Sequence, residues 1–121
     1  MQDYRQFRVG PDPFGRTWSV DFVWLQTGIA IRHADTVDVK FAVNDGEARE
    51  ERVIALPHPL LKAATAKRNR PLNDAWCMKV AALHLIKMIQ TGEDTEKSLV
   101  TLSAEDIEAA AAELEKKRNA A

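Results

Sequence analysis

The stretch that decides the fold runs from Thr36 to Gly46 and reads TVDVKFAVNDG. Apolar side chains occupy every second position from Val37 to Val43, with polar or small ones between them. Because successive side chains of a strand point to opposite faces, this alternation predicts an antiparallel strand with one buried face and one wet face. Residues 44–46, Asn-Asp-Gly, tolerate the positive φ angles of a tight hairpin, so we expect the chain to turn back here.

Three other runs show the same period of two and predict further strands. They extend from Thr17 to Gln26, from Ile29 to His33 and from Glu47 to Leu56. We expect Thr27 and Gly28 to form a turn between the first two of these runs. One face of the first run carries the large apolar residues Trp18, Val20, Phe22 and Trp24. Together the four runs predict an antiparallel β-meander of about four strands in residues 1–56.

The run from Thr17 to Gln26 is apolar on its other face as well, because Val23 and Leu25 lie opposite the tryptophan row. A strand of this kind needs a cover for its second face or its edge. One cover is the segment from Arg5 to Val9, paired beside the strand after the Pro/Gly-rich loop 10–15, and the other is a second subunit. We expect Val23 and Leu25 to form a subunit or partner contact unless the N-terminal segment covers them.

Two prolines, at positions 57 and 59, end the strand pattern and begin a helical one. A residue before a proline is pushed out of the α conformation, so His58 is predicted to be the N-cap of a short helix that reaches Asn69. Asn73 is predicted to cap a second helix, which continues to Gln90 or Thr91 and ends before Gly92.

The second helix is the predicted core helix, because apolar residues surround much of its circumference. They are Trp76, Val80, Leu83, Leu85, Ile86 and Ile89. Residues 99–102 are expected to add an edge strand or to lead into the last helix, which begins at Ser103 with a capping box to Asp106. The fold class is therefore α+β, with the sheet packed against two to three C-terminal helices.

The composition fits one globular domain. A chain of 121 residues, 45% hydrophobic and 29% charged, has the size and balance of a single domain, with residues 1–56 as its sheet half and residues 57–121 as its helical half. Its one cysteine, Cys77, favours a reducing, cytoplasmic location. The N-terminus lacks an apolar leader, and the longest uncharged apolar-rich stretch, Phe22 to Ile31, is too short to span a bilayer, so no membrane association is expected.

The ionisable residues form no catalytic or metal-binding motif. His33, His58 and His84 lack the short spacing of zinc ligands, and the five glycines are too scattered for a phosphate loop, so no metal or cofactor is expected. Cys77 is expected to be a buried residue packed on Leu72 rather than a nucleophile. Spacing leaves open whether His33, His58 or Cys77 meet in a pocket. His58, at a helix N-terminus, is a candidate anion-binding residue.

A basic segment stands out from the charge pattern. Residues 58–92 hold six basic residues and one acidic residue, whereas the whole chain has a net charge of −1. The candidate polyanion contacts are Lys62, Lys67, Arg68 and Arg70. No aromatic residue lies among them to stack on a base, and the acidic residues after Glu93 are expected to neutralise part of this surface. Nucleic-acid binding is therefore the disfavoured alternative.

These observations predict a small cytoplasmic non-catalytic domain that acts by protein binding or self-assembly, most concretely as a homodimer through Val23 and Leu25. Two alternatives stay open. One is nucleic-acid or polyanion binding through the basic helix 60–70. The other is an enzyme whose pocket is built from distant residues, with His33 and His58 as candidates.

Overall fold

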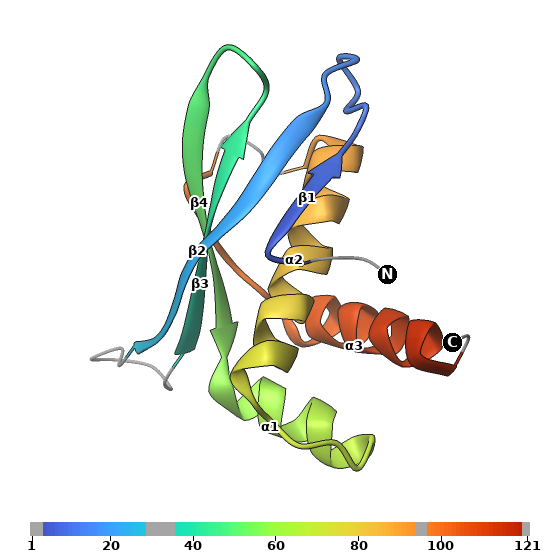
Figure 1. Ribbon diagram of the computed structural model, residues 1–121. Coiled ribbons are helices and arrows are strands. Elements are labelled where there is room, and N and C mark those ends of the chain that lie inside the picture. Colours follow the sequence, from blue (N-terminus) through green and yellow to red (C-terminus); the bar gives the residue numbers. More distant parts are fainter. Residues whose placement is uncertain (1–3, 29–35, 94–96, 120–121) are drawn as a thin grey trace.

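The computed structural model describes residues 4–28, 36–93 and 97–119. These residues form a five-stranded sheet and three helices, an α+β fold (Figure 1). The strands β1 (Gln6–Val9), β2 (Trp18–Gly28), β3 (Thr36–Asn44) and β4 (Arg49–Pro57) pair antiparallel in sequence order, and β5 (Leu99–Thr101) joins β4 in parallel. The helices are α1 (His58–Lys67), α2 (Asp74–Thr91) and α3 (Ala104–Asn119). The predicted fold class and the order of sheet before helices are confirmed.

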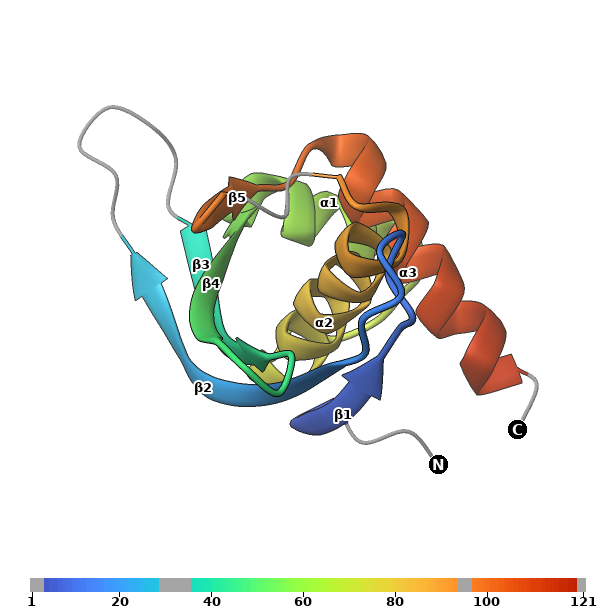
Figure 2. The same ribbon diagram turned by 90° about the horizontal axis from the view of Figure 1, so that it is seen from above.

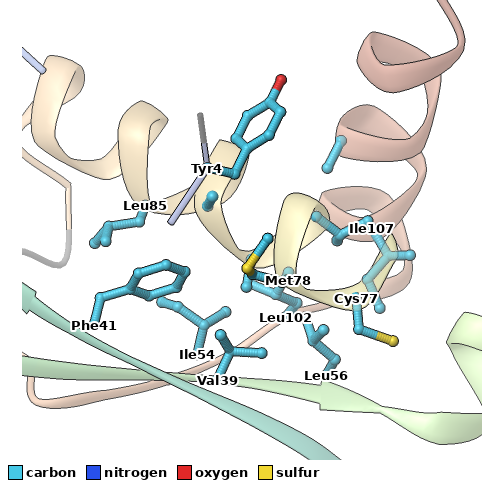
Figure 3. Packing of buried hydrophobic residues seen from close by; sticks show 14 of the residues in the cluster. Tyr4, Val39, Phe41, Ile54, Leu56, Cys77, Met78, Leu85, Leu102 and Ile107 are labelled. Atoms are coloured by element: carbon cyan, nitrogen blue, oxygen red, sulfur yellow. The ribbon is translucent and has the colours of Figure 1, made fainter. Parts of the chain in front are cut away.

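The sheet curls around α2, as Figure 2 shows. This helix buries apolar side chains on most sides of its axis, namely Trp76, Cys77, Met78, Val80, Ala81, Ala82, Leu85, Met88 and Ile89. A flat sheet would contact only one side of such a helix, whereas the curved sheet together with α3, which also packs against α2, removes these side chains from water. The concave face contributes Val39, Phe41 and Ile54, each 0% exposed. Figure 3 shows them gathered beneath Leu85 and Met78.

The predicted signals at both ends of α2 and at the start of α3 are confirmed. The Asn73 side chain accepts a hydrogen bond from the Trp76 amide at 2.8 Å, and α2 ends at Gly92, whose φ of 76° is left-handed. At the start of α3, the Ser103 amide donates to the Asp106 carboxylate at 3.0 Å and the Asp106 amide donates to the Ser103 hydroxyl at 3.2 Å. This is the reciprocal capping box that the sequence predicts.

The predicted cap of α1 is wrong by one residue. Pro57 is the N-cap, with extended φ and ψ of −61° and 123°, and His58 is the first helical residue. No side chain caps this end. The strand β4 runs directly into α1, so Pro57 serves both as the last strand residue and as the cap, and its fixed φ suits both positions.

The path of β2 differs from the prediction at two points. Thr27 and Gly28 do not turn: they pair with Val37 and Thr36 of β3, and the predicted strand from Ile29 to His33 lies outside the described residues. Trp24 does not share the face of Trp18, Val20 and Phe22, because the register shifts between Phe22 and Trp24. This bulge inserts one residue, Val23, and so reverses which face each later side chain takes.

The bulge places Trp24 on the convex face and Leu25 on the concave face. Trp24 pairs with Lys40, while Leu25 pairs with Val39, a fully buried residue, and packs against the core. Val23 is 40% exposed. Val23 and Leu25 therefore do not form the common apolar surface that strict alternation predicts.

Phe41 is expected to be the most costly residue to truncate. It is fully buried and meets Phe7 and Phe22 edge to face, with ring centroids 6.4 and 6.1 Å away. We predict that Phe41→Ala lowers the free energy of unfolding in urea by about 3 to 5 kcal/mol, because it loses buried area and leaves a cavity. The control Phe14→Ala, at a side chain that is 81% exposed, should change it by about 0.5 kcal/mol or less. Similar losses for both variants would contradict this core.

Candidate functional site

Part of one edge of β2 has no strand beside it in the described structure. β1 pairs with β2 from Gln6 opposite Asp21 to Val9 opposite Trp18, and one further bond joins the Phe22 amide to the Arg5 carbonyl at 2.7 Å. The predicted pairing of the N-terminal segment is confirmed for this half. Beyond the bulge residue Val23, residues 24–28 pair with β3 alone, and we call the stretch 23–28 the open edge of β2.

Tyr4 explains why β1 does not extend along the open edge. Its side chain is 8% exposed and belongs to the hydrophobic core. Figure 3 shows it lying over α2, away from the sheet. Because Arg5 is opposite Phe22, a strand continued backward past Arg5 would run beside Val23 and Trp24, and the burial of Tyr4 takes the chain elsewhere.

The open edge lacks the features that usually protect a strand edge from association. Exposed edges are commonly short or carry charges. The outer strand β1 has four residues and an exposed Arg8, and β5 has only three residues. The open edge has six residues, none of them charged. Its charged neighbours on the convex face are Asp38, opposite Gln26, and Lys40, opposite Trp24. The Lys40 ammonium lies 5.5 Å from the centre of the Trp24 ring and 3.0 Å from Glu51.

A second feature is a cleft of about 400 Å³ where the curled sheet opens near the C-terminal end of α2. We call it the mouth cleft. Three segments distant in sequence form it: the loop and strand start 12–18, the β3–β4 hairpin around residues 43–52, and α2 with its cap, 85–92. Its lining is Asp12, Pro13, Phe14, Arg16, Trp18, Val43, Asp45, Ala48, Glu50, Arg52, Leu85, Met88, Ile89 and Gly92.

Asp12 organises the loop wall of the mouth cleft. One carboxylate oxygen accepts from the amides of Phe14 and Arg16, both at 2.9 Å. The other accepts from the Arg16 Nε at 3.1 Å and the Trp18 Nε1 at 3.0 Å. Four donors on a buried carboxylate fix the loop and hold both side chains in place.

The same hydrogen bonds control the ionisation of Asp12. Burial raises the pKa of Asp12, but the hydrogen bonds from the Trp18 indole, from the Arg16 and Phe14 amides and from the Arg16 side chain outweigh it, and the pKa falls from 3.8 to about 2. Asp45, in the β3–β4 turn, also has a lowered pKa, because the Ala48 and Glu47 amides donate to it and Arg16 lies nearby. Both carboxylates therefore stay charged at neutral pH and act as fixed acceptors.

The guanidinium of Arg16 joins the loop to the hairpin. Its NH1 lies 3.5 Å from the Asp45 carboxylate, and its carbon lies 5.5 Å from the Phe14 ring centre and 4.9 Å from that of Trp18. Glu50 and Arg52, two residues apart on β4, form a further ion pair on the hairpin wall of the cleft. They stand opposite Val43 and Phe41, so they occupy the concave face, where the core would otherwise continue.

The histidines and the cysteine do not come together in a described pocket. His58 is half-buried at the start of α1 and lines none of the described cavities, and His33 lies outside the described residues. His84 lines a separate groove of about 520 Å³ between β1, α2 and α3. Whether His58 binds an anion stays a prediction. Among the described residues, no three His, Cys, Asp or Glu side chains gather as a metal site requires.

Cys77 lies in the core, as the sequence predicts. Its residue is 2% exposed, and burial together with the Asp74 charge raises the pKa of its thiol from 9.0 to about 11. The thiol is therefore protonated at neutral pH, which makes it a poor nucleophile.

The basic helix α1 is partly neutralised by α3. Glu108 accepts from the Lys67 ammonium at 3.1 Å and from the Arg68 guanidinium at 3.0 and 3.1 Å. These bonds to Arg68 and Lys67 lower the pKa of Glu108. Of the four candidate polyanion contacts, Lys62 is exposed and Arg70 is half-buried.

Comparison with known proteins gives no family to draw on. No family model matches the chain, and neither a curated protein nor a solved structure matches it. None of the helices formed by the described residues is long and apolar enough to cross a bilayer.

Sequence reasoning missed the polar lining of the mouth cleft. The sequence pattern places Glu50 and Arg52 in a solvated, charged strand, and it places Asp12 in a turn-forming loop. The alternation of side chains held a signal for these residues. The strand from Val37 to Val43 has a continuous apolar face, and the strand that pairs with it places charged side chains on that same face.

The ionisation of Asp12 gives a pH prediction. A carboxylate with a folded pKa of about 2 and an ordinary value of 3.8 stabilises the fold above about pH 4, and this contribution is lost as the pH falls toward 2. We expect Asp12→Asn to unfold at lower urea concentration at pH 7, and to lose less additional stability than the wild type between about pH 4 and pH 2. Parallel pH profiles for the two proteins would contradict this role.

Proposed function

We propose that this chain is a non-catalytic protein-binding domain that self-associates, and that the open edge of β2 is the surface through which two copies pair. The observation that supports this most strongly is a run of six residues of β2 that carries no charge and that has no described strand on its outer side. A strand edge presents backbone N–H and C=O groups at the spacing of another strand, so an extended polypeptide is its natural partner.

A second copy suits this edge better than a charged partner. Pairing two identical edges antiparallel gives a twofold interface in which each copy contributes the same residues. Like charges on directly opposite strand positions destabilise such pairs, and the open edge carries none. At about 3.3 Å per residue, six residues provide about 20 Å of edge. The pairing also covers Val23, which is 40% exposed, and the half-buried Trp24 beside it.

Leu25 has a different role in this proposal from the one that strict alternation suggests. Because Leu25 packs into the core of its own chain, it supports the edge from the concave side, and Val23 is the apolar residue offered to the second copy. The Val23 substitution below tests whether Val23 lies in the interface.

The two other functional classes receive less support. Polyanion binding through Lys62, Lys67, Arg68 and Arg70 competes with the ion pairs that Glu108 makes to two of them. For an enzyme, the described residues offer no histidine or cysteine inside the mouth cleft, and its carboxylate Asp12 is held charged by four hydrogen bonds.

Introducing a charge at the open edge tests the proposal. We expect the wild-type protein to sediment as a monomer–dimer equilibrium at micromolar to high micromolar concentration. Val23→Lys should raise the dimer dissociation constant about tenfold or more, equivalent to about 1.4 kcal/mol, because the interface would cover the ammonium group and remove it from water without a partner. Gln26→Lys, at an exposed position of the same edge, should have the same effect.

Leu99→Lys is the matched control, since Leu99 is a 56% exposed apolar residue on the opposite edge of the sheet. It should leave the dissociation constant unchanged. Thermal unfolding of each variant separates loss of pairing from loss of fold. A wild type that stays monomeric at high micromolar concentration, or a dimer that both edge variants leave intact, would rule out pairing through this edge.

A further inference from the structure

The mouth cleft has the dimensions and the lining of a small-ligand site. Its volume of about 400 Å³ falls within the range of about 300 to 1,000 Å³ that such sites occupy. Its floor is apolar and already dry, consisting of Val43, Leu85, Met88 and Ile89, each 5% exposed or less. The polar groups converge on this floor from the loop and the hairpin. A ligand here would meet an apolar surface with a few placed charges.

The stability of the fold does not explain why charged residues lie on the concave face of the sheet. Glu50 and Arg52 lie opposite the buried residues Val43 and Phe41, and placing charges on the core face costs desolvation energy. An apolar pair at these positions would extend the core. Violations of the binary pattern of this kind concentrate at functional sites.

The cationic groups of the cleft are already engaged. The Arg16 guanidinium is bound by the carboxylates of Asp12 and Asp45 and lies over the Phe14 and Trp18 rings. Arg52 is bound by the Glu50 carboxylate and donates to the Glu51 carbonyl at 3.0 Å. An anionic ligand would have to displace one of these carboxylates to reach a guanidinium.

The carboxylates are in excess and one of them is accessible. Three carboxylates, Asp12, Asp45 and Glu50, face two guanidiniums, so the lining has a formal charge of −1. Solvent reaches 48% of the Glu50 side chain, but only 10% of that of Asp45 and 5% of that of Asp12. Glu50 is therefore the carboxylate of the lining that is most open to an incoming cation, which would share it with the Arg52 guanidinium.

We propose that the mouth cleft binds an organic cation, with its apolar body on the floor formed by Val43, Leu85, Met88 and Ile89 and its ammonium group at Glu50. Charge complementarity selects the cation, and the apolar floor selects a ligand with a hydrocarbon portion over an inorganic ion. This site lies on the concave side of the sheet near the end of α2, apart from the open edge of β2, so it stands independently of self-association.

Three ligands with the same six-carbon tail separate charge from hydrophobicity. Hexylammonium, 1-hexanol and hexanoate are titrated into the ¹⁵N-labelled protein, and the amide shifts of cleft residues such as Ala48 and Gly92 report binding. We expect saturable shifts that map to the cleft, with hexylammonium at least about tenfold tighter than hexanoate and hexanol between them. Equal or tighter binding of hexanoate, or no saturable shift in the cleft for hexylammonium, would overturn the proposal.

Glu50→Gln tests the acceptor. This variant should lower hexylammonium affinity to that of hexanol and leave hexanol affinity unchanged. The matched control Glu47→Gln removes an exposed carboxylate that does not line the cleft, and it should change neither affinity. Hexylammonium affinity that survives Glu50→Gln contradicts the assignment.

A second variant keeps the test decisive if Glu50→Gln perturbs the fold. Ala48 is exposed on the cleft wall, so Ala48→Trp fills the cleft from outside the core. It should weaken hexylammonium and hexanol alike by about tenfold or more, and retained binding of both would place the ligand elsewhere.

The same chemistry exists in a free amine and in a lysine side chain of a protein. Nα-acetyl-lysine-N-methylamide, which has an ammonium on four methylene groups, distinguishes the two sources. An affinity equal to that of hexylammonium indicates that the ligand is a lysine side chain of a protein. An affinity about tenfold weaker than that of hexylammonium indicates that the ligand is a free amine.

Discussion

Packing of the concave sheet face against α2 is the interaction on which the rest of the structure depends. The helix buries side chains around most of its circumference, and the fully buried residues Val39, Phe41 and Ile54 meet it from the sheet. The bent sheet covers part of that wide surface, and α3 covers another part. Figure 2 shows the helices of the described residues on the concave side of the bend. A cleft lies where the sheet meets the end of α2. Both candidate surfaces, the open edge of β2 and the mouth cleft, are consequences of this one packing arrangement.

The bulge at Val23 connects the core to the open edge. It lies where the pairing with β1 ends, and beyond it the strand returns Leu25 to the core while Trp24 faces outward. Tyr4 completes the arrangement, since its burial ends the run of β1 beside β2. The edge that remains is supported from the concave side and unprotected along its backbone. Stabilisation of the core and exposure of a binding surface thus arise from the same few residues.

Local patterns predicted a large part of this fold. The alternation from Val37 to Val43, the caps at Asn73 and Gly92 and the Ser103–Asp106 box depend on contacts within a few residues, and each is confirmed. The bulge was not predictable in this way, because an inserted residue is visible only in the register between two strands. The mouth cleft was missed for a related reason. Asp12, Glu50 and the end of α2 meet only after folding, and no spacing within the chain brings them together.

Native-state hydrogen exchange of the α2 backbone is the most direct test of the central packing. If the sheet encloses this helix, the amides from Val80 to Met88 exchange only when the whole protein unfolds. The free energy of opening at these amides then equals the free energy of unfolding measured in urea. In Phe41→Ala, both free energies fall by the same amount. Two results would show that α2 is not held inside the sheet. One is an opening free energy several kcal/mol below the free energy of global unfolding, and the other is an opening free energy that the Phe41 substitution leaves unchanged.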